Sequence, residues 1–270
     1  VFGLRRPKSA IPGTDIAGTV EAVGGSVVDL KPGDEVFGNC TGAFAEYAVA
    51  SASELVARPA GLDFESTSAL GVSAQTALQA IKDHLGVESG QKVLVTGASG
   101  GVGSFAVQVA KALGAEVTAV CSARNAELVR SIGADHVIDY TSEDFTRGEE
   151  RYDRILDNVG AHSMSDTRKA LAPDGLLLSN GAPVGGWFGG LGNPLRGMLW
   201  SIVSKQQARP FISTYSQADG KALKELVEEG KLKPVIDRVF PLDDGPAAVA
   251  HVASGHTQGK TIITMGQSAD

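Results

Sequence analysis

Cysteine is scarce in this chain, because Cys40 and Cys121 are the only two among 270 residues. They stand far apart and form no Cys-x-x-Cys pair, which excludes a disulfide-stapled scaffold and a cysteine-based structural zinc site. The five histidines show no metal-ligand spacing either. The sequence therefore predicts a protein without a metal site in a reducing, cytoplasmic setting.

Excess positive charge and long apolar runs are also missing. The chain has 24 Lys and Arg residues against 31 Asp and Glu, a formal net charge of −7, and so lacks the basic footprint of a nucleic-acid-binding protein. No apolar run is long enough to predict a transmembrane segment. The chain opens on Val1 rather than Met, and we expect it to begin partway through a domain.

The first sixty residues predict antiparallel β-structure that forms part of a barrel. Short apolar runs at 17–23 and 43–50 are separated by Gly and Pro. Residues 31–34 read Lys-Pro-Gly-Asp, which is typical of a type II turn. No helix is expected before about Glu65.

From about residue 67 onward, strands alternate with helices. Helices are predicted at 67–81, at 101–113 before Gly114, at 125–132 and at 164–171. Apolar strands are predicted at 92–98, 116–121, 136–140, 154–159 and 175–181. This alternation is typical of an α/β fold with a doubly wound parallel sheet. A helix at 218–230 and a strand at 259–265 follow.

The stretch Val-Thr-Gly-Ala-Ser-Gly-Gly-Val-Gly-Ser-Phe-Ala at 95–106 fits three enzyme motifs. Gly101-x-Gly103-x-x-Ala106 is a dinucleotide-binding loop, in which glycines let the backbone approach a pyrophosphate at a helix N-terminus. Thr96 with the glycines that follow it suits a short-chain dehydrogenase. Gly97-x-Ser99-x-Gly101 is the nucleophile elbow of an α/β-hydrolase.

The surrounding sequence favours the dinucleotide-binding loop. A strand precedes it and a helix follows it within a βαβ unit. A hydrolase would use Ser99 with partners such as Asp157 and His251, but β-like segments precede the loop here where hydrolases have βα units. A short-chain dehydrogenase needs Tyr-x-x-x-Lys, and no tyrosine of this chain has Lys four residues later.

The end of the second strand of this βαβ unit indicates which nicotinamide cofactor binds. An acidic residue there would bind the ribose of NAD, whereas this chain reads Cys-Ser-Ala-Arg-Asn at 121–125. Ser122 and Arg124 are suited to the extra phosphate of NADP. The sequence therefore predicts NADPH as cofactor.

The whole pattern resembles the medium-chain dehydrogenase/reductase superfamily, in its zinc-independent quinone oxidoreductase branch, and is most similar to reticulon-interacting-protein-like members. The segments that carry the resemblance cover nearly the whole length: PGTDIAGTVEAVG, KPGDEVFG, GAFAEYAVA, VLVTGASGGVGSFAVQVAK, LGAEVTAVCS, IGADHVIDY, ILDNVG, KPVIDRVFPL and GHTQGKTIITM. The resemblance implies a Rossmann domain at 64–213 and an N-terminally incomplete GroES-like β-barrel substrate domain at 1–63 and 214–270. Zinc enzymes of the superfamily carry Gly-His-Glu where this chain has Gly13-Thr14-Asp15.

Matching positions imply a set of cofactor-binding residues. Those expected at the pyrophosphate are Gly97, Ser99, Gly100, Gly101, Val102 and Gly103. Those expected along the adenosine half are Ser122, Arg124 and Tyr140. Those expected toward the nicotinamide are Thr76, Asn158, Val159, Asn180 and Gly181. Lys260 is expected to reach back to the cofactor, with a solvated lysine as the alternative.

The resulting hypothesis is an NADPH-dependent reductase that transfers hydride to a small, apolar, electron-poor quinone or α,β-unsaturated carbonyl. No side chain stands out as a catalytic acid, and Asp15 and Tyr47 near the expected cleft are interpreted as structural. The alternative is a non-catalytic NADPH-binding sensor or scaffold protein. The apolar segment at 183–209 is interpreted as a lid, a homodimer contact or a membrane-surface helix; its members are Trp187, Phe188, Leu191, Leu195, Leu199 and Trp200, beside Arg196, Lys205 and Arg209.

Overall fold

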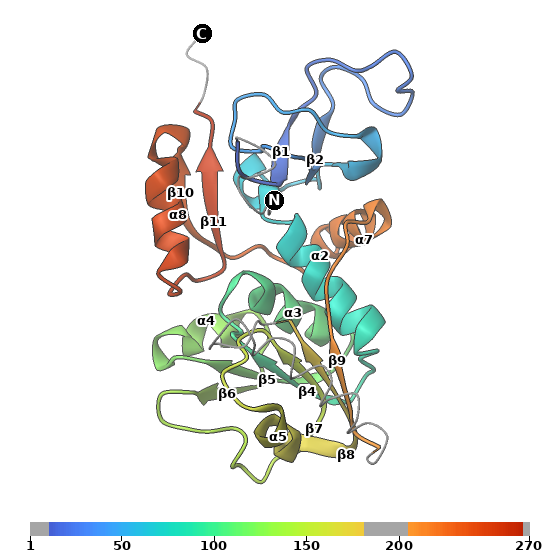
Figure 1. The fold of residues 1–270 in the computed structure, drawn as a ribbon. Helices are drawn as coiled ribbons and strands as arrows, with labels where there is room; N and C mark the ends of the chain where they lie inside the picture. Colours follow the sequence, from blue (N-terminus) through green and yellow to red (C-terminus); the bar gives the residue numbers. More distant parts are fainter. Residues whose placement is uncertain (1–10, 181–204, 267–270) are drawn as a thin grey trace, which may run out of the picture. The chain divides into compact units, whose positions relative to one another are not determined.

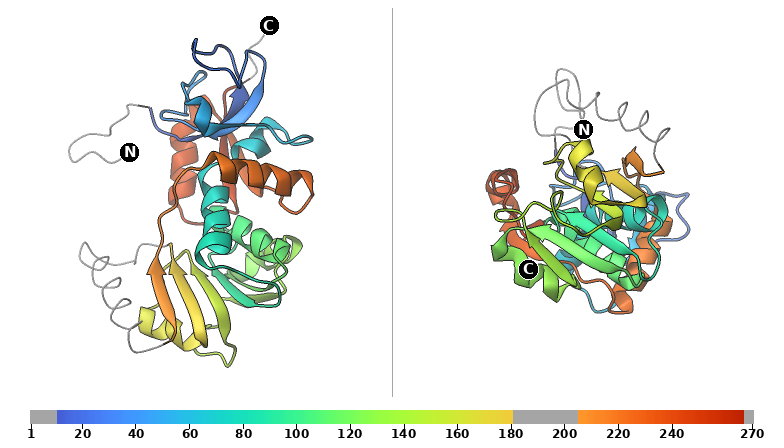
Figure 2. Two further views of the ribbon diagram at one scale, coloured as in Figure 1. Left: turned by 90° about the vertical axis from the view of Figure 1, so that its right-hand side faces the viewer. Right: turned by 90° about the horizontal axis from the view of Figure 1, so that it is seen from below.

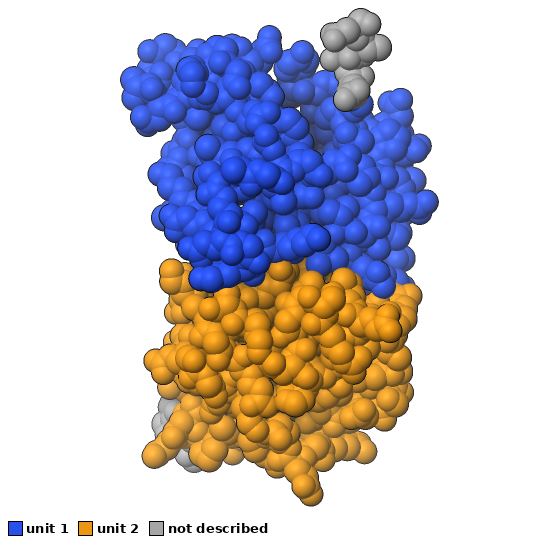
Figure 3. Space-filling model, turned by 180° about the vertical axis from the view of Figure 1, so that it is seen from behind, with its two compact units in different colours: residues 1–75, 214–270 blue, residues 76–213 orange. Residues whose placement is uncertain are grey.

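The computed structural model of this protein describes residues 11–180 and 205–266 (Figure 1). Its contacts divide the chain into two compact units, residues 1–75 with 214–270, and residues 76–213 (Figure 3). The domain limits expected from the sequence stay a prediction. Each unit is described by itself below. No helix of the described residues is both long enough and apolar enough to cross a membrane.

The unit at 76–213 is built on a six-stranded parallel sheet (Figure 2). Its strands, in spatial order, are β6 (His136–Asp139), β5 (Glu116–Cys121), β4 (Lys92–Thr96), β7 (Tyr152–Asp157), β8 (Leu171–Ser179) and β9 (Gln207–Pro210). The chain runs outward from β4 to β6 and then returns to β7 on the other side of β4. This is the doubly wound Rossmann order that the sequence predicts, and its direction reverses between β4 and β7.

The central strands are apolar throughout because both faces of a parallel sheet are covered. Val93, Leu94 and Val95 of β4 are fully buried. The helix α3 (Gly101–Ala112) packs against β4 and β5 and ends where Gly114 adopts a φ of 85°, as its sequence predicts. Short helices join the other strands: α4 (Ala126–Ser131) and α5 (Met164–Thr167), with 3-10 turns η3 (Ala123–Asn125) and η4 (Arg168–Ala170).

The single helix expected at 67–81 is wrong. The segment forms α1 (Phe64–Ser68), α2 (Val72–Leu78) and a π-helical turn, η2 (Gln79–His84). Gly71 lies between α1 and α2, and a Cβ there would lie 2.3 Å from the Cγ of Asp15. The Asp15 carboxylate instead accepts a hydrogen bond from the backbone N–H of Val72 at 3.0 Å and so begins α2.

The other unit contains two small sheets. The first is antiparallel, in the order β1 (Asp15–Thr19), β2 (Glu35–Asn39) and β3 (Leu55–Ala57), and the second pairs β10 (Ile236–Pro241) with β11 (Lys260–Thr264) in parallel. Around them lie α7 (Gln217–Glu228), α8 (Gly245–Ala253) and the 3-10 turns η1 (Ala52–Glu54) and η5 (Leu242–Asp244). The predicted type II turn is confirmed, since Gly33 has a φ of 90° and the N–H of Asp34 bonds to the carbonyl of Lys31.

The strand predicted at 43–50 is wrong, because this segment forms bends. The N–H groups of Ala43 and Phe44 bond to the carbonyls of Gly13 and Pro12 rather than to a strand. Apolar residues of the segment are exposed, with Tyr47 at 75% and Val49 at 92%. A hollow of about 1170 Å³ in this unit is lined by this segment together with β1, β11 and α8.

Candidate functional site

The glycine loop, residues 97–100, connects β4 to α3 in a conformation that only glycines allow. Gly97 has a φ of 60°, in the left-handed region. A Cβ on Gly103 would lie 2.1 Å from the carbonyl oxygen of Gly97, so the backbone of the first turn of α3 packs directly against the backbone of the loop. The backbone conformation at Gly97 and the close packing at Gly103 therefore require glycine, as the dinucleotide-binding motif predicts.

The N-terminus of α3 is left open toward the loop. Its N-cap residue is Gly100, with a ψ of −177°, and within the described residues no side chain caps the helix. The first helical N–H groups, at Gly101, Val102 and Gly103, have no carbonyl four residues earlier to bond to. Such N–H groups, at the positive end of a helix dipole, bind anions.

A polar network joins the carboxyl ends of β4, β7 and β8. Asp157, only 7% exposed, accepts a hydrogen bond from the Thr96 hydroxyl at 2.6 Å. Asn158 bonds through its backbone N–H to Thr96 Oγ1 at 2.9 Å and through its amide to the Thr96 carbonyl at 3.0 Å. The amide of Asn180 reaches Asn158 Oδ1 at 3.0 Å. The strand ends on either side of the sheet's reversal point are thus cross-linked.

The network brings Asn158, Val159 and Asn180 next to the glycine loop. The N–H of Val159 bonds to Asp157 Oδ1 at 3.2 Å, and a Cβ on Gly97 would meet Val159 Cγ2 at 3.0 Å. Sequence reasoning named Thr96 and Asp157 only in the short-chain dehydrogenase and hydrolase interpretations and did not expect them in this network. The signal that could have found them is their position at the carboxyl ends of neighbouring parallel strands, where ligands bind in such sheets.

The hydrolase interpretation of Ser99 fails on its hydrogen bonds. A nucleophilic serine needs a base within hydrogen-bond reach, whereas Ser99 Oγ accepts from the amide of Asn125 at 2.8 Å. Asp157 is held by Thr96 and by backbone N–H groups. The imidazole of His251 contacts Asp237 at 2.5 Å. The three residues proposed for a triad therefore have other partners.

The turn after β5, residues 122–125, carries the residues expected at the adenosine phosphate. Arg124 is exposed on it, and Ser122 is half-buried. The Asp139 carboxylate at the end of β6 accepts hydrogen bonds from the N–H and hydroxyl of Thr141 and from the N–H of Ala123, and these bonds hold the pKa of Asp139 below its usual value. Tyr140, next in sequence, is 60% exposed.

Two other predicted residues, Thr76 and Lys260, make contacts within their own units. Thr76 is buried and its hydroxyl shares a hydrogen bond of 2.7 Å with Ser213. Lys260, in the other unit, lies 3.4 Å from Asp15 Oδ2 and 3.0 Å from Ser73 Oγ. The side chain of Lys260 is only 19% exposed, so it is not a freely solvated lysine. Its expected role stays a prediction.

Gly181 and most of the apolar segment at 183–209, including Trp187, Phe188, Leu191, Leu195, Arg196, Leu199 and Trp200, lie outside the described residues. The interpretations of this segment stay open.

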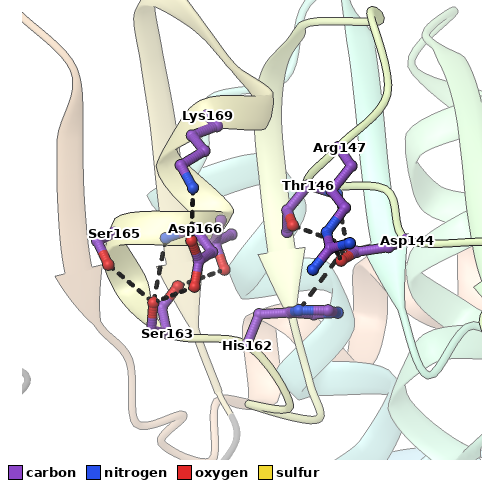
Figure 4. Close-up of polar contacts among 9 residues, drawn as sticks. Asp144, Thr146, Arg147, His162, Ser163, Ser165, Asp166 and Lys169 are labelled. Carbon is purple, nitrogen blue, oxygen red and sulfur yellow. Dashed lines mark hydrogen bonds and ion pairs between the residues drawn. The ribbon is translucent and has the colours of Figure 1, made fainter.

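Four histidines contact an acidic or aromatic side chain: His84, His136, His162 and His251. His162 lies 3.9 Å from Asp144 and packs edge-on against Phe145, beside the Thr146 and Arg147 contacts of the same carboxylate (Figure 4). His84 packs against Phe211. In the parts of the chain that the structure describes, no three His, Cys, Asp or Glu side chains gather as a metal site would require. Burial raises the pKa of both cysteine thiols.

Comparison with known proteins places this arrangement in a family. The chloroplast envelope quinone oxidoreductase homolog of Arabidopsis thaliana is 35% identical over 279 residues, covering 96% of this chain and 81% of that protein. The chain belongs to the medium-chain dehydrogenase/reductase superfamily. Two family models agree: "Alcohol dehydrogenase GroES-like domain" at residues 2–60 and "Zinc-binding dehydrogenase" at residues 132–263.

Other members of the superfamily are similar over most of the chain. The mitochondrial NAD(P)H oxidoreductase RTN4IP1 of Homo sapiens is 36% identical, covering 94% of this chain and 70% of its own, and the trans-enoyl reductase pgmF of Aspergillus terreus is 34% identical, covering 95% and 78%. Among solved structures, the quinone oxidoreductase from Coxiella burnetii has a TM-score of 0.83 at 28% identity, covering 94% and 79%. Mycobacterial Rv1454c complexed with NADPH has a TM-score of 0.80 at 26%, covering 93% and 81%.

Membership makes the protein an oxidoreductase of the medium-chain dehydrogenase/reductase type, as the sequence predicts. One family model carries zinc in its description, and independence of zinc stays a prediction that rests on Thr14 and Asp15. Two relatives are named for the chloroplast envelope and the mitochondrion, so the cytoplasmic location expected from the cysteine content is not confirmed. The homodimer also stays a prediction.

Proposed function

We propose that this protein is an NADPH-dependent reductase that delivers a hydride to a small, electron-poor acceptor, either a quinone or an α,β-unsaturated carbonyl. The observation that carries the proposal is the open N-terminus of α3, which follows a glycine loop at the point where the strand order reverses. Dinucleotides bind at that point in doubly wound sheets.

The residues present fit such a cofactor. A Cβ at Gly97 would meet Val159 and one at Gly103 would meet the loop backbone, so glycines at both positions keep the loop packed closely against the start of α3. The N–H groups at that helix end are suited to a pyrophosphate. Asn158, Val159 and Asn180 present polar and apolar groups at the adjacent strand ends. Bound NADPH would supply the hydride, and the residues of this chain would bind, orient and shield it from water.

Preference for NADPH over NADH rests on Ser122 and Arg124. The position at the end of β5 that would carry an acid for the NAD ribose is Ser122. Arg124 is exposed beside it and provides a guanidinium for a phosphate. Asp139, the nearest acid at the neighbouring strand end, is already bonded to Ala123 and Thr141.

The class of acceptor is proposed from the relatives, which include quinone oxidoreductases and a trans-enoyl reductase. Quinones and α,β-unsaturated carbonyls both accept a hydride at an electron-poor carbon or oxygen. No residue is assigned as proton donor, and the proton for either acceptor comes from solvent in this proposal.

The test is to mix the protein with NADPH and a panel of quinones and enones and to follow the absorbance of the reduced nicotinamide. Consumption of NADPH with at least one acceptor, and slower consumption of NADH, is the expected result. Tight binding of NADPH with no turnover across the panel would favour the non-catalytic sensor or scaffold. Binding of neither nucleotide would overturn the proposal altogether.

A further inference from the structure

Asn125 is a buried amide that lies between two loops of the proposed cofactor site. It ends the turn at 122–125, and its own backbone N–H bonds to the carbonyl of Ser122 at 2.9 Å. Its side chain points the other way, to the glycine loop after β4, and the residue is only 4% exposed. A buried amide in such a place costs free energy unless it is hydrogen-bonded.

The bond that Asn125 makes determines what the Ser99 hydroxyl can do. Asn125 Nδ2 lies 2.8 Å from Ser99 Oγ, and an amide nitrogen only donates. Ser99 Oγ is therefore the acceptor, which leaves the hydroxyl hydrogen to be donated elsewhere. Ser99 directly precedes Gly100, the N-cap of α3, where the N–H groups of the helix open toward an anion.

The turn at 122–125 is also hydrogen-bonded to the end of a second strand. The Asp139 carboxylate accepts the N–H of Ala123 and also binds Thr141, so the turn at 122–125 is attached to the end of β6. With Asn125 bound to Ser99, the turn is attached to the end of β4 as well. Arg124 therefore lies on a segment that is hydrogen-bonded to the chain at the ends of both β4 and β6.

We propose that Asn125 is a positioning residue with two effects on cofactor binding. It leaves the Ser99 hydroxyl as a donor for the pyrophosphate, and it holds the turn that carries Arg124 at a fixed distance from the glycine loop. This inference rests on the proposed function. The first effect concerns a group that NADPH and NADH share, whereas the second concerns the phosphate that only NADPH has.

The experiment measures dissociation constants of NADPH and NADH for the full chain and for Asn125→Ala, Ser99→Ala and the double variant. Ser99→Ala should weaken both cofactors equally, by about tenfold, the effect of losing a hydrogen bond to a charged group. Asn125→Ala leaves the Ser99 hydroxyl in place but no longer fixes its direction, so it should weaken NADH by no more than Ser99→Ala does, and NADPH further. For NADH the double variant should bind no more weakly than Ser99→Ala alone, because Asn125 acts on NADH through that hydroxyl.

Multiplying losses in the double variant would show that Asn125 and Ser99 act independently and would overturn the first effect. An unchanged ratio of NADPH to NADH affinity in Asn125→Ala would overturn the second. If the unaltered protein binds neither cofactor, the proposed function itself fails. If every variant binds both cofactors as tightly as the unaltered protein, only the inference about Asn125 fails.

Two further variants separate positioning from loss of the fold. Asn125→Asp has almost the same shape but only accepts at neutral pH, so it should draw the Ser99 proton to itself and weaken both cofactors at least as much as Ser99→Ala. High affinity in Asn125→Asp would overturn the assigned direction of the bond. Ser131→Ala on α4 removes a hydroxyl that donates only to Leu128 and should change neither constant. Thermal unfolding of every variant checks that it is folded.

Discussion

At the scale of single residues, Arg124 carries the cofactor preference. Its substitution by Ala should raise the dissociation constant of NADPH by about tenfold or more, because a charge-assisted bond to the phosphate is lost. The constant for NADH should change by less than about twofold, since no such bond exists there. Equilibrium binding titrations with both nucleotides check this.

The matched control for Arg124 is Arg130→Ala, another exposed cation on the following helix. It removes the same charge from the same unit and should leave the preference for NADPH unchanged. Equal weakening of both nucleotides by Arg124→Ala would argue against contact with the adenosine phosphate.

Gly103 is a residue of the glycine motif at which a single methyl group should be strongly disruptive. The Cβ of Gly103→Ala would lie 2.1 Å from the Gly97 oxygen and 2.7 Å from Ala98 Cα, both backbone atoms that cannot rotate away. We expect a destabilisation of about 1–3 kcal/mol, typical of overpacking, together with loss of NADPH binding. Chemical denaturation and nucleotide titration measure the two effects.

Gly148→Ala is the control for Gly103, because the nearest atom to its Cβ, the Phe145 oxygen, is 3.7 Å away. The control should retain both stability and binding. If Gly103→Ala behaves like the control, the close approach between α3 and the glycine loop is not required.

Sequence reasoning at this scale found the glycines and missed the side chains that hold them. The glycines form a local pattern whose meaning depends on the strand before them and the helix after them. Asn125 lies 26 positions from Ser99, and Thr96 lies 61 from Asp157, so no spacing in the sequence brings either pair together. Such pairs follow only from the order of strands in the sheet.

At the scale of elements, Asp15 begins α2 and also pairs with Lys260. Asp15→Ala should destabilise the protein by about 1–3 kcal/mol, because it removes a helix cap and leaves a half-buried ammonium without its partner. Asp15→Asn keeps an oxygen for the Val72 N–H but loses the charge, so it should cost less. Urea unfolding midpoints measure both variants.

Asp29→Ala serves as the control for Asp15, since Asp29 is an exposed carboxylate in the same unit. It should leave the midpoint unchanged. Equal midpoints for Asp15→Ala and Asp15→Asn would show that the ion pair, and not the cap, is what matters.

Elements with strong local signals were predicted correctly, and those that depend on distant residues were not. The strands at β4 and β5 and the helix α3 are confirmed, because apolar periodicity and a terminal glycine define them locally. The N–H of Val72, where α2 begins, bonds to Asp15, which lies 57 positions earlier in the sequence. The segment at 43–50 alternates like a strand, but the backbone groups it bonds to are Pro12 and Gly13.

At the scale of the whole molecule, stability should depend on pH through its carboxylates. Hydrogen bonds and ion pairs hold several carboxyl pKa values below their usual range, among them those of Asp34, Asp139, Asp144, Glu150, Asp166 and Glu228. A lowered native pKa stabilises the fold above the unfolded value near 4 and loses that effect as the pH falls through the native value.

Unfolding temperatures should therefore be constant from about pH 5 to 7 and fall progressively below about pH 4. Each of these groups is exposed or only partly buried, so single substitutions should have small effects. Asp139→Asn combined with Asp144→Asn should reduce the fall of the unfolding temperature at acid pH. An unfolding temperature that stays level down to pH 2.5 would show that these pairings contribute nothing to the folded state.

The cross-linked ends of β4, β7 and β8 have a thermodynamic consequence for ligand uptake. Thr96, Asp157, Asn158 and Asn180 are joined to one another by hydrogen bonds that do not involve a ligand. The backbone there loses little conformational freedom when a ligand arrives, so little of the binding free energy is spent on ordering it. Amide protons of Asn158 and Asn180 should exchange with deuterium slowly in the ligand-free protein, and ligand should slow them only slightly further.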